Sequence, residues 1–577
     1  MPDPSEIDPP EPDSGEPQVK LRFITARPDL EPARRESRAA INAHASQASW
    51  ARIRERLRQG TGPQTSQKKP VHNKEQRRAR FPDDRASSES ELRSSNGDGG
   101  KRPGAGFVDS EEELPFRTAG TAIFESARVS SLEFSDVDPF TTYPSRLAKE
   151  VAMPIVSEVN RFLQIILLPN PHRQEQSIKQ QWIYRYMNDD VLFHMLCFSY
   201  LARASTTKHG LNPINQRAYG YCYSELVRGL NRRLNNLETR YSDEILFAVQ
   251  TLAFHGRAVE DDTDKPQSPS QGPLNSMQLL DIYAGRLDAV DVHLKALSKI
   301  VSMKGGLSEI KFPGLAAMLS YGDLLLASRY LRKPVYPFIP LQISPQHVLD
   351  AVRRDVHPLG QLGTGFRALY DLLPSDVARP LFLTLHNLST YSLAVDDYIM
   401  GRSQAQDLGA LADQRNFVQH NLLSRSLGPD GDVHSPKEDA IVLQQACWAA
   451  AVIYSLIAVF PVPHRRAPFA KLAYQLKHSL VYTNNLLTSR WHDSSSLLLW
   501  MIFMGALAST ANDEGGGEQE GCKEWYINVL ERFVHRMQIA SWGALKDQLL
   551  NFLWFPSTSD ADGQQLWTEI NTSNPFI

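Results

Sequence analysis

The segment from residue 440 to residue 463, AIVLQQACWAAAVIYSLIAVFPVP, contains no charged side chain and strongly constrains the fold. Its length would let a helix cross a bilayer of about 30 Å, so a membrane span is one interpretation. However, Gln444 and Gln445 would need hydrogen-bond partners in lipid, and Pro461 and Pro463 end the helix early. We therefore expect a helix at the centre of a large helical core and no contact with membrane; a membrane-associated protein is the alternative.

Helical periodicity dominates the chain after about residue 130. Between residues 290 and 304, apolar residues recur at spacings of three and four, at Val290, Leu294, Leu297 and Val301, with Ala296, Ile300 and Met303 widening the stripe. No run of alternating strand residues bounded by turn signals persists in the sequence. The prediction is an all-α fold, a large helical array.

Residues 1–115 have a different composition. Serine, proline, glycine and charged residues dominate, so the segment cannot bury enough apolar surface to offset the entropy of ordering it. We predict a disordered tail, interrupted at residues 21–60 by a short extended piece and a basic helix. Residues 116–137 are a predicted linker, and residues 138–577 form the predicted helical domain.

The formal net charge of −3 gives no global attraction to nucleic acid or acidic membranes. Residues 50–85 nevertheless contain eleven basic and four acidic side chains, a local balance of +7. Within them, residues 66–80 resemble a nuclear localisation signal, and its candidate residues are Lys68, Lys69, Lys74, Arg77, Arg78 and Arg80. The sequence thus predicts a nuclear protein with weak, non-specific DNA contact through this tail; a solvated tail that binds nothing is the alternative.

The four cysteines, Cys197, Cys222, Cys447 and Cys522, are too widely scattered for a disulfide framework or paired metal ligands. We therefore expect no metal and a reducing, intracellular compartment. The N-terminus also lacks the charged start and apolar run of a secretory signal.

Signatures of common enzymes are absent: the nucleophile elbow, the H-E-x-x-H pair, the phosphate loop and the dinucleotide fingerprint. The aspartate pairs at residues 189–190 and 396–397 lack the third acid that a magnesium-binding D-D-x-x-D helix requires. Three histidines lie singly in apolar helices, where a hydrogen-bonded core residue is the expected state: His194, His293 and His420. The prediction is a protein that is not an enzyme and has no cofactor; the alternative is a helical small-molecule receptor or enzyme with a buried hydrophobic pocket.

Gly305 and Gly306 follow the helix predicted at residues 290–304. Lys304 suits the negative end of the helix dipole, and Gly305 can adopt the left-handed conformation that ends a helix, with Leu307 folding back as the hydrophobic contact. A phosphate-binding loop would need its glycines before a helix. The pair is therefore predicted to be a C-cap.

Six motifs occur in one order along the chain: DPFTTYPSRL, HLKALSKIVSMKGGL, RNFVQHNLLS, ACWAAAVIYSLIAVFPVP, SLLLWMIFMGAL, and SWGALKDQLLNFLW with DADGQQLW. Together they resemble the fungal-specific transcription factor domain, the helical regulatory region usually joined to a zinc binuclear cluster. FITARPDLEP and the basic helix after it resemble the subgroup without that cluster. The resemblance covers residues 21–60 and about 138–570, and it implies a nuclear transcription regulator that acts through protein partners of the transcription machinery.

Carried over position by position, the resemblance assigns packing and capping roles to His293, Gly305, Gly306, Arg415, Asn416, His420, Trp542, Phe552, Trp554, Asp560, Gly563 and Trp567. The sequence departs from the family where a Glu-x-Cys-Arg order is replaced by Gln445 to Trp448, and where RSLGPD replaces a leucine-proline pair. Six closely spaced thiolates for a zinc cluster are missing, so no DNA-reading module of that type is expected.

Overall fold

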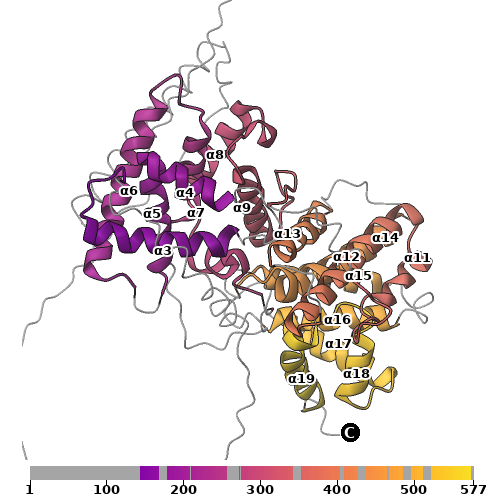
Figure 1. Cartoon of the computed structure of the whole chain (residues 1–577). Coiled ribbons are helices and arrows are strands. Elements are labelled where there is room, and N and C mark those ends of the chain that lie inside the picture. Colours follow the sequence, from indigo (N-terminus) through magenta and orange to yellow (C-terminus); the bar gives the residue numbers. More distant parts are fainter. Residues whose placement is uncertain are drawn as a thin grey trace, which may run out of the picture. The chain divides into compact units, whose positions relative to one another are not determined.

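The computed structural model describes residues 143–167, 178–207, 210–256, 272, 274–341, 352–402, 408–425, 437–463, 467–484, 495–510 and 521–572. Within these ranges the regular elements are helices joined by turns and bends (Figure 1), which confirms the all-α prediction. All of the described residues belong to one compact unit, which contains two hydrophobic cores. The predicted tail at residues 1–115, with its basic helix and basic run, and the predicted linker at 116–137 lie outside the described residues.

The first core is formed by the N-terminal helices and is drawn in indigo to magenta in Figure 1. α5 packs against α3, α4 and α6, and α7 packs against α8 and α9. The elements are α3 (Lys149–Leu167), α4 (Ile178–Asn188), α5 (Asp190–Ala204), α6 (Pro213–Leu234), α7 (Asp243–Phe254), η2 (Met277–Leu279), η3 (Ile282–Arg286), α8 (Asp291–Lys304), η4 (Leu307–Glu309) and α9 (Leu315–Tyr330).

Side-chain caps fix where several of these helices begin. Asp189 accepts a hydrogen bond from the backbone N–H of Leu192 at the start of α5, and Ser242 accepts one from Ile245 at the start of α7. Asp243, in the first turn of α7, forms an ion pair with Lys304 at 2.9 Å. This pair ties the start of α7 to the end of α8.

α8 is the helix predicted at residues 290–304, and its C-terminus follows the prediction. Gly305 is left-handed, with φ of 97°, and the N–H of Gly306 donates to the carbonyl of Val301 at 3.0 Å. Leu307 is buried, as its predicted capping contact requires. The apolar stripe was predicted too wide, however, because Met303 is 50% exposed and points away from the core.

The second core is formed by the C-terminal helices, orange to yellow in Figure 1. Its elements are η5 (Thr364–Ala368), α11 (Leu369–Leu372), α12 (Ser375–Ile399), α13 (Leu408–Ser424), α14 (Lys437–Tyr454), η6 (Ser455–Val459), α15 (Phe469–Asn484), α16 (Ser495–Ser509), α17 (Cys522–Arg536), α18 (Trp542–Leu549) and α19 (Pro556–Thr572). α14 packs against α12, α13, α15 and α16.

The uncharged segment that opened the sequence analysis lies in α14 and η6. Ala440–Val459 is long and apolar enough to cross a membrane, and it is the one such stretch among the described helices. Residues 449–460 are all buried within the protein, and the helix ends at Val459, two residues before Pro461. Because a central core helix also passes the test of length and composition, this burial favours the core interpretation over the membrane alternative.

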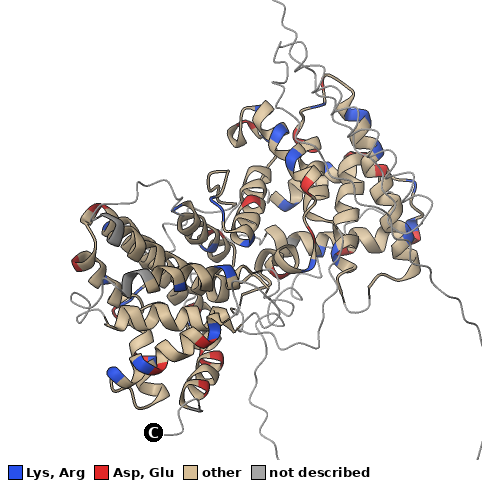
Figure 2. Ribbon diagram, turned by 180° about the vertical axis from the view of Figure 1, so that it is seen from behind, with Lys and Arg blue, Asp and Glu red and all other residues tan. Residues whose placement is uncertain are grey.

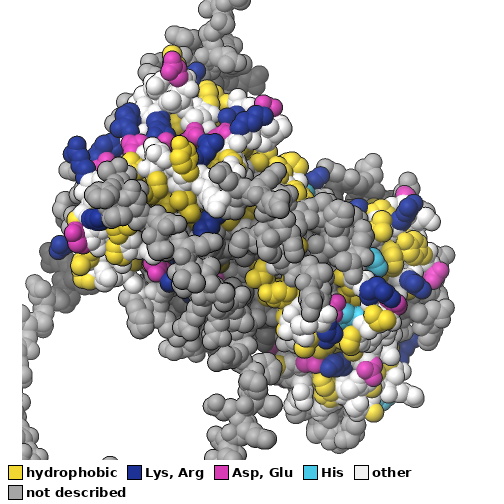
Figure 3. All heavy atoms as spheres, in the orientation of Figure 1, with side chains coloured by type: hydrophobic (Ala, Val, Ile, Leu, Met, Phe, Trp, Pro, Cys, Tyr) yellow, Lys and Arg dark blue, Asp and Glu magenta, His cyan; other side chains and the backbone are white. Residues whose placement is uncertain are grey.

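Charged residues are distributed over both groups of helices. Figure 2 shows basic and acidic positions interspersed along the described ribbon, and Figure 3 shows the same mixture on one face, where apolar side chains lie between the charges. Large exposed apolar residues include Tyr184 on α4 and Leu237 after α6. The described surface therefore presents both signs of charge in close alternation.

Candidate functional site

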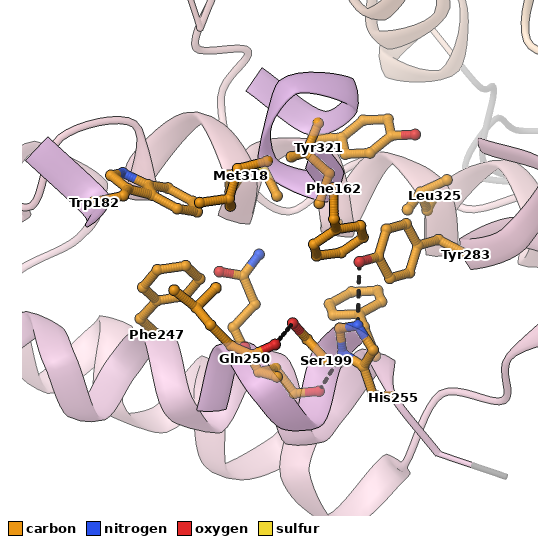
Figure 4. A pocket seen from close by; sticks show the side chains of 16 residues that line it. Phe162, Trp182, Ser199, Phe247, Gln250, His255, Tyr283, Met318, Tyr321 and Leu325 are labelled. Atoms are coloured by element: carbon orange, nitrogen blue, oxygen red, sulfur yellow. Dashed lines mark hydrogen bonds between the residues drawn. The ribbon is translucent and has the colours of Figure 1, made fainter. Parts of the chain in front are cut away.

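An apolar cavity lies between α3, α4, α5, α7, η3 and α9 (Figure 4). It is lined mainly by residues of the first core, with Phe254, Tyr321 and Leu325 contributed by the second. The cavity is partly open to solvent. Six aromatic residues supply much of the wall: Phe162, Trp182, Phe247, Phe254, Tyr283 and Tyr321.

Hydrogen bonds within the protein occupy most of the polar groups in this wall. The hydroxyl of Ser199 donates to the carbonyl of Leu196 at 2.9 Å. His255 Nδ1 lies 2.8 Å from the carbonyl of Thr251, which can only accept, so Nδ1 carries the proton. His255 Nε2 then accepts from the hydroxyl of Tyr283 at 3.1 Å. The histidine is thereby held in one neutral tautomer.

The residues that line the cavity also carry no charge. Among the lining residues there is no aspartate, glutamate, lysine or arginine. Burial lowers the pKa of His255 to about 4, so its imidazole is uncharged at neutral pH. Burial likewise raises the pKa of Tyr283, which keeps its hydroxyl protonated. The wall is neutral over the physiological pH range.

Gln250 on α7 is the exception to this pairing. Its side chain projects into the cavity (Figure 4), and the residue is only 6% exposed. Its Oε1 atom is the buried side-chain acceptor in the described wall that has no hydrogen-bond partner. A buried acceptor without a donor costs about 1–3 kcal/mol relative to solvated amide, so this position is energetically incomplete.

The sequence analysis did not single out Gln250 or His255. The available signal was one amide inside an apolar helix, ILFAVQTLAF, whose other residues are apolar except Thr251. Such an amide must face a partner, a cavity or a ligand once the helix is buried. The hydrophobic pocket considered as an alternative from sequence thus has a physical location in the first core.

Two of the three singly placed histidines, His194 and His420, are hydrogen-bonded as expected. His194 is 2.6 Å from the carbonyl of Asp190 and 3.0 Å from the hydroxyl of Ser145. His420 donates from Nε2 to the carbonyl of Tyr336 at 2.9 Å. His293 lies on α8, and burial lowers its pKa to about 4. These residues belong to the framework.

The aspartate pairs are engaged in capping and ion pairs. Asp190 lies 2.6 Å from Arg232 and 3.0 Å from Arg233, although burial opposes the resulting fall in the pKa of its carboxyl group. The carboxylates at positions 396 and 397 both contact the guanidinium of Arg402. In the described parts of the chain, no group of three or more His, Cys, Asp or Glu residues is arranged to hold a metal ion.

Arg415, predicted from the resemblance to be a packing residue, is completely buried. Its guanidinium donates to the carbonyl of Met277 at 2.9 Å and to Oε1 of Gln278 at 2.7 Å. Asn416 donates to the same Gln278 oxygen at 3.0 Å. These bonds join α13 to η2, where Gln278 has a φ of 56°, a left-handed conformation that is unfavourable outside glycine.

Two aromatic rings pack against the same guanidinium. The ring of Tyr321 is centred 5.7 Å from it and that of Phe460 5.3 Å from it, distances at which a cation is attracted to the ring face. Tyr321 also lines the cavity. The cavity wall and the surroundings of Arg415 therefore share a side chain.

The last motif forms a compact aromatic cluster in the second core. Trp554 donates from Nε1 to Asp560 at 2.8 Å, and Lys546 donates to the other oxygen of that carboxylate at 2.5 Å. A Cβ atom on Gly563 would lie 2.5 Å from the ring of Trp542. Phe552 and Trp567 pack against the same core. These are packing positions, as the resemblance implies.

The four cysteines are buried free thiols. Cys197 on α5 and Cys222 on α6 meet in the first core, although their spacing in sequence did not indicate a pair. A hydrogen bond with Cys222 and burial together raise the pKa of Cys197 well above its usual range. The Cys197 thiol is thus held in the protonated, unreactive form.

A scan against protein-family models, a search of curated proteins and a search of solved structures each returned no match. The resemblance to the fungal transcription factor domain therefore stays a prediction based on the six ordered motifs. The candidate nuclear localisation residues lie outside the described residues, so their role also stays a prediction: Lys68, Lys69, Lys74, Arg77, Arg78 and Arg80.

Proposed function

We propose that the protein is a nuclear transcription-regulatory protein of fungal type, which acts through protein partners and whose helical part is the regulatory domain. The proposal is supported by the order of the six motifs and by the places their residues occupy. Gly305 ends a helix, Arg415 joins α13 to η2, and Gly563 lets two tryptophans approach. Motif residues in such positions describe a shared framework, which is the basis of the family assignment.

Contact with DNA is assigned to the basic residues between positions 50 and 85. On the face drawn in Figure 3, acidic side chains lie among the basic ones, whereas residues 50–85 carry a balance of +7. Binding through the tail alone should be indifferent to base sequence and should fall steeply between about 50 and 200 mM salt. A competition assay with the full chain at these two salt concentrations measures this; sequence preference retained at high salt would contradict the assignment.

A reporter assay tests the regulatory role directly. The full chain is fused to a heterologous DNA-binding domain and expressed in yeast with a reporter gene under that domain's operator. The fusion should raise or lower reporter output relative to the DNA-binding domain alone, because the fused domain brings the chain to the reporter promoter. Equal output from equal amounts of the two nuclear proteins would reject the proposal.

Nuclear entry is tested separately with a fluorescent fusion. Replacing Lys68, Lys69, Arg77 and Arg78 with alanine should move the fusion to the cytoplasm, since recognition of a basic signal depends on those charges. The matched control removes the same charge from the neighbouring basic helix, through alanine at Arg52, Arg54, Arg56 and Arg58. Unchanged nuclear fluorescence in the first variant would show that the nuclear localisation signal lies elsewhere in the chain.

A further inference from the structure

We propose that the cavity in the first core is a binding site for a neutral, largely apolar molecule with an aromatic ring, which donates one hydrogen bond from a hydroxyl or N–H group to Gln250 Oε1. Binding at this site does not depend on a role in transcription. The proposal follows from the shape, the charge and the hydrogen-bonding state of the wall.

The aromatic wall favours a ring-shaped occupant. Trp182, Phe247 and Phe162 lie around the space into which Gln250 projects (Figure 4). The ring centroids of Trp182 and Phe247 are 4.6 Å apart and the rings are inclined at 64°, an edge-to-face arrangement, and both residues line the cavity. Flat apolar molecules gain both burial and ring contacts at such a wall.

The charge of the wall excludes ions. A charged group moved from water into an apolar site without a counter-charge carries a large desolvation cost. The described lining offers neither a carboxylate nor a cation, and His255 is held neutral by its bonds to Thr251 and Tyr283. A carboxylate or ammonium version of the ligand should therefore be rejected.

The one hydrogen bond is dictated by Gln250. The hydroxyl of Ser199, the imidazole of His255 and the indole N–H of Trp182 are already paired within the protein, the last with the carbonyl of Pro313 at 2.8 Å. Gln250 Oε1 is left as an acceptor. A water molecule needs two to four polar partners to be well held, and this part of the wall offers it mainly one. An apolar molecule with a single donor matches the wall better.

The chain supplies a matched control for Gln250. Gln414 on α13 is fully buried, and its amide nitrogen and oxygen both lack hydrogen-bond partners among the described residues. It does not line the cavity. Replacing Gln414 with leucine removes a buried unpaired amide, as Gln250→Leu does, but leaves the proposed site intact.

Three probes that share a naphthalene ring test the proposal on the full-length protein: 2-naphthol, 2-methoxynaphthalene and 2-naphthoate. Dissociation constants are measured by isothermal titration calorimetry at pH 7. The wild type should bind 2-naphthol about tenfold more tightly than 2-methoxynaphthalene, which has no donor, and should not bind 2-naphthoate. Gln250→Leu should bind the naphthol and the ether equally, whereas Gln414→Leu should retain the wild-type preference.

Each result bears on the proposal. Equal affinity of the wild type for naphthol and ether would overturn the role of Gln250, even if Gln250→Leu failed to fold. Binding of naphthoate would overturn the neutral site. Absence of binding by all three probes, or loss of the preference in Gln414→Leu with circular dichroism like that of the wild type, would reject the cavity as the site.

Discussion

Two buried glutamines, Gln419 in the second core and Gln250 in the first, are in opposite hydrogen-bonding states. In the second core, Gln419 donates from Nε2 to the hydroxyl of Ser328 at 2.9 Å and accepts from the hydroxyl of Ser455 at 2.5 Å. In the first core, Gln250 is also buried, but its side-chain carbonyl faces a cavity and receives no hydrogen bond from the described residues. An amide that is paired within the protein fixes how its helices pack. An unpaired amide oxygen at a cavity can instead accept a hydrogen bond from a ligand.

The helices of the two cores also differ in how completely they are buried. α16 in the second core is buried at every residue from 497 to 509, and the indole of Trp500 donates to the carbonyl of Leu553 at 3.0 Å. α8 in the first core is amphipathic, with Val292 and Met303 at the surface. We infer that the second core mainly stabilises the fold and that the first core combines stability with a binding site.

The largest effect should come from Arg415, which joins α13 to η2. Arg415→Ala leaves the carbonyl of Met277 and the amide oxygen of Gln278 without donors and opens a void, so unfolding should become easier by about 3–5 kcal/mol in urea titrations. Arg185 is the control: it also lies over an aromatic ring, but its side chain is 42% exposed. Arg185→Ala should cost about 1 kcal/mol or less. Equal losses of stability in the two variants would show that the buried Arg415 contributes no more than the partly exposed Arg185.

Acid should destabilise the first core through its histidines. The pKa of His255 is about 4 in the folded chain and about 6.5 when unfolded, so the unfolded state binds more protons between these values. Stability should be complete above about pH 6.5 and fall as the pH approaches 4, by up to about 3 kcal/mol for this residue. His255→Gln cannot be protonated, so its stability should fall less over the same range. His293 adds a similar dependence that the variant retains.

Urea titrations at pH 7.5, 6, 5 and 4.5 measure this dependence. Parallel curves for wild type and His255→Gln would show that the histidine is not neutralised by burial.

Close packing in the second core should be sensitive to a single methyl group. Gly563→Ala places a carbon about 2.5 Å from Trp542 and 2.7 Å from Trp554, so one indole ring must move, at a cost of about 1–3 kcal/mol. Gly543 on α18 meets only the hydroxyl of Ser541, at 3.8 Å. Gly543→Ala should therefore be neutral or stabilising in the same thermal unfolding measurement. A destabilised Gly543→Ala with an unaffected Gly563→Ala would contradict the packing described for this cluster.

A smaller effect is expected at the end of α8. Gly305→Ala puts a Cβ on a residue with φ of 97°, which costs about 1–2 kcal/mol in the left-handed region. Gly220, inside α6 and with nothing within 4 Å of an added Cβ, is the control, and its alanine variant should gain about 0.5–1 kcal/mol. Thermal unfolding distinguishes the two; a stabilised Gly305→Ala would show that the cap is not required.

Local features of the fold could be read from the sequence because they depend on neighbours in the chain. The Ser242 cap, the Gly305 cap and the end of the apolar helix before Pro461 each require only a few consecutive residues. Helical spacing also identified most of the buried face of α8, but it could not show that Met303 lies just beyond the edge of the neighbouring helices.

The candidate site could not be located in this way, since its wall comes from six elements spread over some 160 residues of sequence. The isolated Gln250 was visible in an apolar helix, but whether it is paired depends on the helices packed around it. The same holds for Arg415, whose acceptors lie 137 and 138 residues away, and for the contact between Cys197 and Cys222. Tertiary convergence decides these features.

The central claim is that the cavity in the first core accepts a neutral ring molecule and that Gln250 recognises its donor. A crystal structure of the full-length protein with 6-bromo-2-naphthol tests this most directly, because anomalous scattering locates the bromine. The expected result is one bromine peak between Phe162, Trp182 and Phe247, with the naphthol oxygen within about 3.2 Å of Gln250 Oε1. A crystal soaked at a saturating concentration of the bromonaphthol whose cavity stays empty would contradict the account. A bound molecule with its hydroxyl turned away from Gln250 would also contradict it.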